Sequence, residues 1–173
     1  MTLAALSPAV FLLACVTAER LGELWLARRN TSALIAAGAV EHAPGHYPLI
    51  VLLHTAWLVG LWALAWSSPI NTLWLVVFLL LQVLRVWVLA TLGPRWTTRI
   101  IVQPGAPLVA RGPYKWLSHP NYVVVIGEIA VLPLALGLPW YALAFSLANA
   151  AVLTIRIRAE NAALVGSRQL LPP

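Results

Sequence analysis

Three polar residues near the C-terminal end of the sequence have types and a spacing that suit binding of a charged small molecule. Asn149, Arg156 and Glu160 are spaced i, i+7 and i+11, and at about 100° per residue an α-helix places them on one face. Arg156 and Glu160 are also four residues apart, so their side chains can form a hydrogen-bonded pair. We take Arg156 and Glu160 as candidate catalytic residues, and Arg156 and Asn149 as candidate substrate contacts.

A second polar group surrounds a histidine–proline pair in the run 118–122, which reads SHPNY. Pro120 suits the first turn of a helix, where its missing N–H is not needed. His119 would then stand at the helix boundary, and Glu128, seven residues after Asn121, would lie on the same helical stripe. A tyrosine and two basic residues shortly before His119 add further binding groups, which favours a functional role over a plain solvated histidine.

The composition of the chain indicates what surrounds these residues. Hydrophobic residues make up 61% of the 173 and charged residues 9%, against about 25% charged in ordinary soluble domains. A soluble domain of this size could not bury so much apolar surface. With a single cysteine, a disulfide scaffold is also excluded. The sequence therefore predicts an all-α integral membrane protein.

Stretches of about 20 apolar residues predict the spanning helices. We expect five transmembrane helices, at about 3–26, 47–66, 72–92, 121–138 and 141–157. Basic residues follow the first, third and fifth helices, whereas the turns at 67–71 and 138–140 carry no charge. Five spans bring all the basic segments to one side, which the positive-inside rule makes cytoplasmic. This predicts the N-terminus outside and the C-terminus cytoplasmic, in the inner membrane if the protein is bacterial.

Charged residues lie inside four of the five expected spans, and they are costly at membrane depth, so they are candidates for function. Arg20 and Glu23 can pair at i, i+3. Arg85 could extend to the headgroups or pair with Glu19, Glu23 or Glu128. A structural pair that holds the first helix to the bundle is the plain alternative. We take Arg85 and Glu128 as candidate substrate contacts.

Two runs of the sequence resemble the isoprenylcysteine carboxyl methyltransferase family. They are GPYKWLSHPNY at 112–122 and, after two apolar helices, RIRAE at 156–160; the family pattern is similar to GPY-(R/K)-xxx-HP-x-Y and R-x-R-x-E-E. Upstream blocks, such as 20–24, 38–41 and 92–100, resemble its small bacterial branch, so the resemblance covers most of the chain. Asn161 departs from the pattern, because a second glutamate usually stands there.

The resemblance implies S-adenosylmethionine as methyl donor, in a pocket formed by the last two helices and the C-terminal segment and open to the cytoplasm. Arg156 would hold an anionic group of substrate or cofactor. Carried over by position, the cofactor-binding residues would be Tyr114, His119, Pro120, Tyr122 and Glu160. We expect one transmembrane methyltransferase domain over residues 1–173, with its cofactor-binding part at about 93–173.

The resemblance further implies O-methylation of a lipophilic acceptor, either an isoprenylcysteine-type carboxylate or the hydroxyl of an alkylpyrone or phenolic lipid. The small bacterial branch often accompanies type III polyketide synthases. Methyl transfer needs mainly positioning and charge stabilisation; a carboxylate such as Glu160 suits the cationic and hydroxyl groups of the cofactor, and an aromatic ring such as Tyr122 can attract a sulfonium.

Two other function classes stay open. One is an NADPH-dependent membrane lipid or sterol-type reductase, since such enzymes share a similar HP-x-Y element. The other is a non-enzymatic transporter or scaffold built around the intramembrane charges. No CxxC or HExxH spacing supports a metal site. The net charge of +6 is attributed to membrane orientation and anionic headgroups. We therefore expect membrane lipids and a lipophilic or prenylated substrate as partners, and no nucleic acid.

Overall fold

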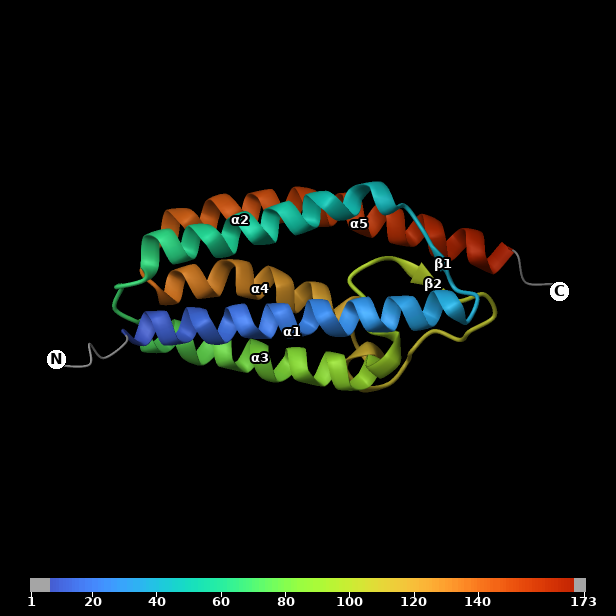
Figure 1. Ribbon diagram of the computed structural model, residues 1–173, viewed down its shortest axis with the longest axis horizontal. Coiled ribbons are helices and arrows are strands. Elements are labelled where there is room, and N and C mark those ends of the chain that lie inside the picture. The colour runs from blue at the N-terminus through green and yellow to red at the C-terminus, as the bar shows by residue number, and fades with distance from the viewer. Residues whose placement is uncertain (1–6, 170–173) are drawn as a thin grey trace.

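The described part of the chain contains five α-helices, which run along one common direction and form an elongated bundle (Figure 1). The computed structural model describes residues 7–169, with side chains through residue 163. The helices are α1 (Pro8–Ala36), α2 (Tyr47–Ala65), α3 (Thr72–Leu92), α4 (Pro120–Ala135) and α5 (Pro139–Gln169). Two short strands, β1 (Val40–Glu41) and β2 (Ile101–Val102), pair antiparallel with Val40 opposite Val102.

Local sequence signals set the helix ends. Ser7 accepts a hydrogen bond from the backbone N–H of Val10 and caps α1, and Asn71 caps α3 in the same way through Trp74. At its far end α3 stops at Gly93, which has a φ of 52°. Glycine adopts this left-handed conformation without the steric cost that a side chain would add, so the chain can leave the helix sharply there.

The predicted spans and the observed helices agree in number and order. The third matches its prediction, 72–92, residue for residue, whereas α1 and α5 extend well beyond 3–26 and 141–157 at their ends distant from the turns. The predicted turn at 138–140 lies slightly earlier, at 136–138, because Gly137 takes a φ of 75° and Pro139 already begins α5.

Three helices in the described part of the chain are long and apolar enough to cross a membrane: Pro44–Ala65, Thr72–Arg95 and Pro139–Ala163. The fourth helix, Pro120–Ala135, is apolar but shorter. The first helix of the chain, α1, carries Glu19, Arg20 and Glu23 in its middle. The mostly helical fold is confirmed, and the five crossings stay a prediction.

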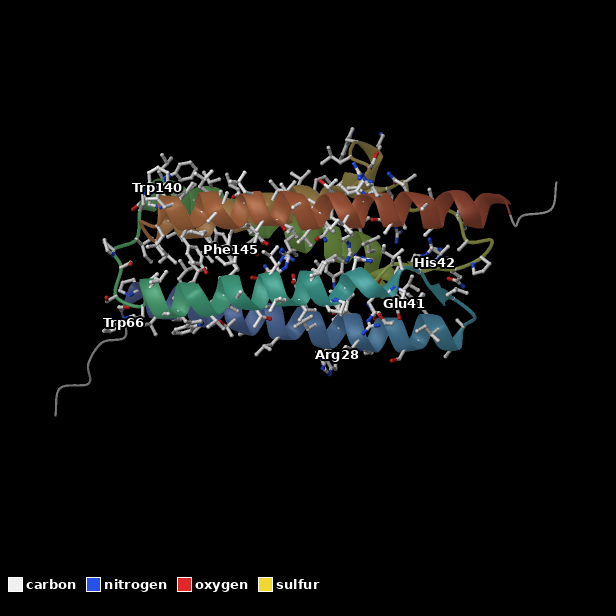
Figure 2. The ribbon with its side chains drawn as sticks, turned by 90° about the horizontal axis from the view of Figure 1, so that it is seen from above. Arg28, Glu41, His42, Trp66, Trp140 and Phe145 are labelled. Carbon is white, nitrogen blue, oxygen red and sulfur yellow. The ribbon has the colours of Figure 1, made fainter. Side chains whose placement is uncertain are left out.

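The two ends of the bundle differ in character. Figure 1 shows the α2–α3 and α4–α5 connections at one end and the β1–β2 pair at the other. Trp66 and Trp140 lie at the end with the short connections, where both are strongly exposed, and Glu41 and His42 lie at the opposite end (Figure 2). Exposed tryptophans at one bundle end suit a membrane–water interface.

The apolar core forms around α4, which packs between α3 and α5. Ile129 and Leu132 of α4 are almost fully buried, and they join one cluster with residues from α1, α2 and α3. The Tyr141 phenol donates a hydrogen bond of 2.8 Å to the carbonyl of Trp57 and thereby joins α5 to α2. This packing fixes the N-terminal end of α4 and the middle of α5 relative to each other.

Candidate functional site

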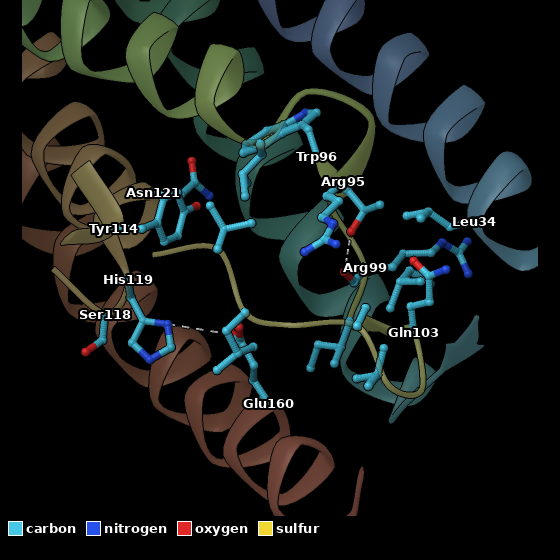
Figure 3. Close-up of a pocket in the computed structure, with 18 of the residues that line it drawn as sticks. Leu34, Arg95, Trp96, Arg99, Gln103, Tyr114, Ser118, His119, Asn121 and Glu160 are labelled. Carbon is cyan, nitrogen blue, oxygen red and sulfur yellow. Dashed lines mark hydrogen bonds and ion pairs between the residues drawn. The ribbon is translucent and has the colours of Figure 1, made fainter. Parts of the chain in front are cut away.

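A cavity of about 830 Å³ lies at the end of the bundle where the strands pair (Figure 3). Arg156 and Glu160 of α5 form one wall, and Asn121 and Tyr122 at the start of α4 form the next. Much of the segment 95–110 completes the lining. Volumes of about 300–1,000 Å³ are typical of small-molecule and cofactor sites, so the cavity can hold an organic ligand.

The turn before α4 places a tyrosine in the pocket wall. The 3₁₀ helix Gly112–Lys115, called η3 below, packs against the end of α3, and Tyr114 lines the cavity. Gly112 has a φ of 56°, and a Cβ added there would lie 2.4 Å from Thr91 Oγ1. Glycine is therefore the residue that allows this close approach.

One chain of hydrogen bonds joins three segments inside the cavity. The Tyr122 phenol donates to the Glu160 carboxylate. Arg156 Nε donates to the Tyr122 oxygen at 2.9 Å, and Arg156 Nη1 donates to the Thr98 carbonyl at 2.8 Å. These bonds tie the start of α4, the end of α5 and the segment after α3 to one point, so a ligand there would contact all three.

The histidine of the histidine–proline pair lies beside this chain. The His119 ring stacks on Tyr122 with the ring centroids 4.9 Å apart and an interplanar angle of 11°. Its Nδ1 is 3.9 Å from Glu160 Oε2 (Figure 3). Pro120 is buried and begins α4 directly after it. The contacts bring His119, Tyr122 and Glu160 to one corner of the cavity.

The pocket wall carries one glutamate and several cationic groups. Arg99 forms an ion pair with Glu41 at 2.8 Å, and Arg95 donates to the carbonyl of Pro107 at 2.7 Å. These bonds hold the segment 95–110 against β1 and against itself. Arg156 completes the cationic set. A ligand with both an anionic and a cationic group would find complementary charge in this wall.

The phenol of Tyr114 is held in its neutral form. Burial raises the pKa of Tyr114 from its usual 10.0 to about 12, and the negative charge of Glu160 contributes in the same direction. The group therefore keeps its proton throughout the physiological range and can act as a hydrogen-bond donor toward a ligand.

Two polar atoms in the cavity-lining residues lack partners in the described part of the chain. Oδ1 of Asn121 and Nε1 of Trp96 are buried and form no hydrogen bond, and both residues line the cavity. Buried polar groups are nearly always satisfied. An acceptor at the start of α4 and a donor in the segment 95–110, both without a partner, therefore suit a ligand that offers both kinds of group.

The predicted substrate contacts Arg85 and Glu128 lie in a different place, deep between α1, α3 and α4. Arg85 Nε donates to Glu128 at 2.7 Å and its Nη1 donates to both oxygens of Glu23 at 2.9 Å. Arg20 bonds to Glu23 at 3.0 Å and to Glu128 at 3.1 Å. Of the two alternatives for Arg85, pairing with these glutamates is the one that the structure shows, and neither Arg85 nor Glu128 lines the cavity.

Asn149 is also outside the cavity. It is buried in α5, seven residues before Arg156, which is about 10 Å along a helix axis. The cavity thus brings together Tyr114, His119, Tyr122, Arg156 and Glu160. It also contains residues to which we assigned no role, above all Arg99, and the Thr98 carbonyl accepts a hydrogen bond from Arg156 beside it. Both residues belong to the block 92–100, which indicated this segment in the sequence.

Comparison with known proteins places the chain among its relatives. The model of the isoprenylcysteine carboxyl methyltransferase (ICMT) family matches residues 74–166, which include α4, most of α5 and every cavity residue from Leu92 to Asn161. YpbQ of Bacillus subtilis (strain 168), an uncharacterized protein, is 40% identical over 158 residues, covering 88% of this chain and 94% of YpbQ.

An uncharacterized protein of Haemophilus influenzae (strain ATCC 51907 / DSM 11121 / KW20 / Rd) is 26% identical over 166 residues, covering 87% of this chain and 91% of that protein. No solved structure matches the chain. The family match spans more than half of the sequence, and the YpbQ similarity extends over nearly all of it. This chain therefore belongs to the isoprenylcysteine carboxyl methyltransferase family.

Proposed function

We propose that this membrane protein is an S-adenosylmethionine-dependent O-methyltransferase that acts on a lipophilic acceptor at the cytoplasmic face of a bacterial inner membrane. The observation that supports it most is the single cavity in which Glu160, Tyr122 and His119 meet Arg156. The family match supports methyl transfer in general, and the cavity supplies the arrangement of groups from which the finer proposal is argued.

The residues present fit the cofactor. A carboxylate in the wall suits an ammonium or ribose hydroxyls, and the stacked His119 and Tyr122 rings offer an aromatic face to a cationic sulfur. The open acceptor on Asn121 and the open donor on Trp96 suit the edge of a purine ring. When bound, S-adenosylmethionine supplies an electrophilic methyl group for an in-line displacement.

Within this site, Glu160 and Tyr122 would orient the cofactor, and Arg156 would orient the acceptor. Arg156 is already bonded through Nε and Nη1. Among the described residues its Nη2 has no hydrogen-bond partner, which leaves one edge for an oxygen of the acceptor. A single contact of this kind positions an oxyanion without neutralising it as a bidentate clamp would.

The apolar part of the acceptor would contact the apolar side chains of the cavity lining. Leu34, Leu92 and Leu108 line the cavity together with the apolar residues of β2. We propose an isoprenylcysteine-type carboxylate, or the hydroxyl of an alkylpyrone or phenolic lipid, as the oxygen nucleophile. A hydroxyl acceptor must lose its proton, and the His119–Glu160 pair, with Nδ1 and Oε2 3.9 Å apart, is the candidate to receive it.

We also propose five membrane crossings with the N-terminus outside. The polar cavity lies at the end of the bundle where the strands pair. Figure 2 shows the exposed Trp66 and Trp140 at the other end, away from Glu41 and His42. Figure 2 shows Arg28 nearer to Glu41 than to Trp66, Arg95 lines the cavity, and Arg111 bonds to Thr91 near the end of α3. Basic residues gathered toward one bundle end are the arrangement that the positive-inside rule assigns to the cytoplasm. A water-soluble cofactor would then reach the cavity from the cytoplasm, and a lipid would reach it from the bilayer.

Equilibrium binding of labelled S-adenosylmethionine to the purified protein in detergent tests the cofactor assignment. We expect binding by the wild type, and binding at least about tenfold weaker for Glu160→Gln, because the neutral amide removes the charge-assisted hydrogen bond. Arg158→Gln on the exposed side of α5 is the matched control, and it should bind like the wild type.

The same titration with NADPH separates the alternatives. Binding of NADPH in place of S-adenosylmethionine would replace the proposal with the reductase, and binding of neither would favour a transporter or scaffold. Incubation of the protein with the labelled cofactor and a bacterial lipid extract, followed by mass analysis, then identifies the acceptor by its added methyl group.

A further inference from the structure

The exposed basic residues around η3 have no acidic partner in the part of the chain that the structure describes. The chain has five acidic residues, all glutamates. Three lie in the buried cluster between α1, α3 and α4, one pairs with Arg99 and one lines the cavity. Arg111 and Lys115 are exposed and form no salt bridge with any of them. Their positive charge is therefore available to an external anion.

An apolar stripe leads up to these basic residues. Leu80, Val83 and Trp87 of α3 are spaced i, i+3 and i+7 and are 64%, 68% and 45% exposed, so they form one outward face of the helix. Trp116, 67% exposed, continues it beyond the end of α3. Its ring lies beside Trp87, with the centroids 5.9 Å apart. In a membrane protein such a face is covered by acyl chains.

The stripe ends where the charges begin. Lys115 Nζ lies 5.7 Å from the centre of the Trp116 ring, a distance at which a cation and an aromatic face attract. Tryptophan side chains concentrate at the level of the lipid headgroups. The tryptophan, the lysine and the nearby arginine thus form one patch, which is apolar toward the bilayer centre and cationic toward the cytoplasm.

We propose that Arg111, Lys115 and Trp116 form a binding site for the headgroup of an anionic phospholipid. The lipid phosphate contacts the two cations, and its upper acyl chain packs on Trp116 and Trp87. Charge complementarity selects an anionic lipid over a zwitterionic one, and the continuity with the exposed stripe of α3 selects a lipid in the bilayer over a soluble anion.

The site has a direct connection to the cavity. Arg111 Nη2 donates to the Thr91 carbonyl at 3.3 Å, which fastens the start of η3 to α3. The same short helix presents Lys115 outward and Tyr114 to the cavity. A bound lipid that holds η3 in place also holds Tyr114 in the pocket wall, so it strengthens binding of the cavity ligand. This second effect rests on the proposed function; lipid binding itself does not.

Fluorescence quenching in lipid nanodiscs tests the lipid site. The protein is placed in phosphatidylcholine that contains a small fraction of phosphatidylglycerol brominated near the top of its chains, and the contribution of Trp116 is obtained as the difference from Trp116→Phe. We expect stronger quenching of Trp116 than with the same fraction of brominated phosphatidylcholine. Each basic residue near a membrane contributes about fivefold to anionic-lipid binding, so Arg111→Gln/Lys115→Gln should weaken the preference about 25-fold.

Arg28→Gln/Arg29→Gln is the matched control, because it removes two exposed arginines of α1 and should leave the preference at Trp116 unchanged. Equal quenching by both brominated lipids, or an equal loss in both double variants, would overturn the proposal. Soluble phosphate that removes the preference at millimolar concentration would also overturn it, in favour of a plain anion site. Cofactor affinity, measured in the same nanodiscs with and without phosphatidylglycerol, tests the connection through Tyr114 separately.

Discussion

Tyr122 at the start of α4 donates its phenol hydrogen to the carboxylate of Glu160 near the end of α5. The two residues are 38 positions apart in the sequence, and the α4–α5 hairpin brings them together. The bond orients the only carboxylate in the cavity lining among the described residues. The same Tyr122 oxygen accepts a hydrogen bond from Arg156, so one phenol orders both Glu160 and Arg156.

Tyr122→Phe should therefore weaken cofactor binding while the protein stays folded. Without the phenol, Glu160 and Arg156 each lose a hydrogen bond that involves a charged group. We expect affinity for S-adenosylmethionine to fall by about tenfold or more, measured by equilibrium binding. Tyr141→Phe removes a phenol that bonds the Trp57 carbonyl elsewhere in the bundle and should bind like the wild type. Equal losses in both variants would point to general destabilisation.

The raised pKa of Tyr114 predicts that this phenol loses its proton at a higher pH than an ordinary tyrosine. Because its folded-state pKa is raised from 10.0 to about 12, its contribution to stability is fully present below pH 10 and is lost as the pH rises through about 12. The absorbance of tyrosinate in wild type minus Tyr114→Phe should show this late titration. Glu160→Gln should shift it to lower pH, since the carboxylate is one cause of the raised pKa. An unchanged midpoint in Glu160→Gln would contradict the placement of these two side chains.

The hydropathy of the sequence predicts helices better than it predicts their ends. The third helix is matched at both ends because Asn71 and Gly93 are strong boundary residues. In contrast, α1 continues for ten residues beyond 26, through the exposed Arg28 and Arg29. Its Asn30 donates to the carbonyls of Gly93 and Trp96. This tertiary contact supports a helical turn that apolar content alone does not indicate.

The sequence predicts the residues of the site only where they belong to a recognisable motif. The pattern around His119 and Glu160 indicates the corner that the structure shows, and the spacing of Arg156 and Glu160 places both on the cavity side of α5. The helical spacing alone also places Asn149 on the same face of α5 as Arg156 and Glu160. That face extends along the whole helix, whereas the cavity contacts only one end of it, so Asn149 lies outside the cavity. The segment 96–100, which brings Arg99 to the wall and the Thr98 carbonyl to Arg156, is neither helix nor strand, so it leaves no periodic pattern.

The buried charge cluster predicts a large stability loss when one partner is removed. Arg85 is 2% exposed and Glu128 is 4% exposed. Arg85→Met leaves Glu23 and Glu128 with Arg20 as their remaining cation, which should cost about 3–5 kcal/mol. Thermal unfolding in detergent measures the loss. Arg29→Met is the same substitution at an exposed arginine of α1, and it should have little effect on stability. Equal melting temperatures of the two variants would argue against a tightly paired cluster.

Gly112 does not line the cavity, but Gly112→Ala should still displace a residue that does. The added methyl group would approach Thr91 Oγ1 to 2.4 Å in a backbone conformation with a φ of 56°, so both the space and the conformation oppose it. The relief available to the chain is to move η3 away from α3, and Tyr114 would move with it. We expect a loss of about 1–3 kcal/mol in stability and weaker cofactor binding in the protein that remains folded.

Gly45→Ala is the control for this substitution, because nothing lies within 4 Å of a Cβ added at Gly45. It should change neither melting nor binding. The double variant Gly112→Ala/Thr91→Ser keeps the hydroxyl and removes the methyl that would lie 3.0 Å away. It should therefore recover only part of the stability, because the hydroxyl would still lie 2.4 Å from the added Cβ and the positive φ remains costly for alanine. Full recovery would show that the methyl group of Thr91 alone requires glycine at position 112.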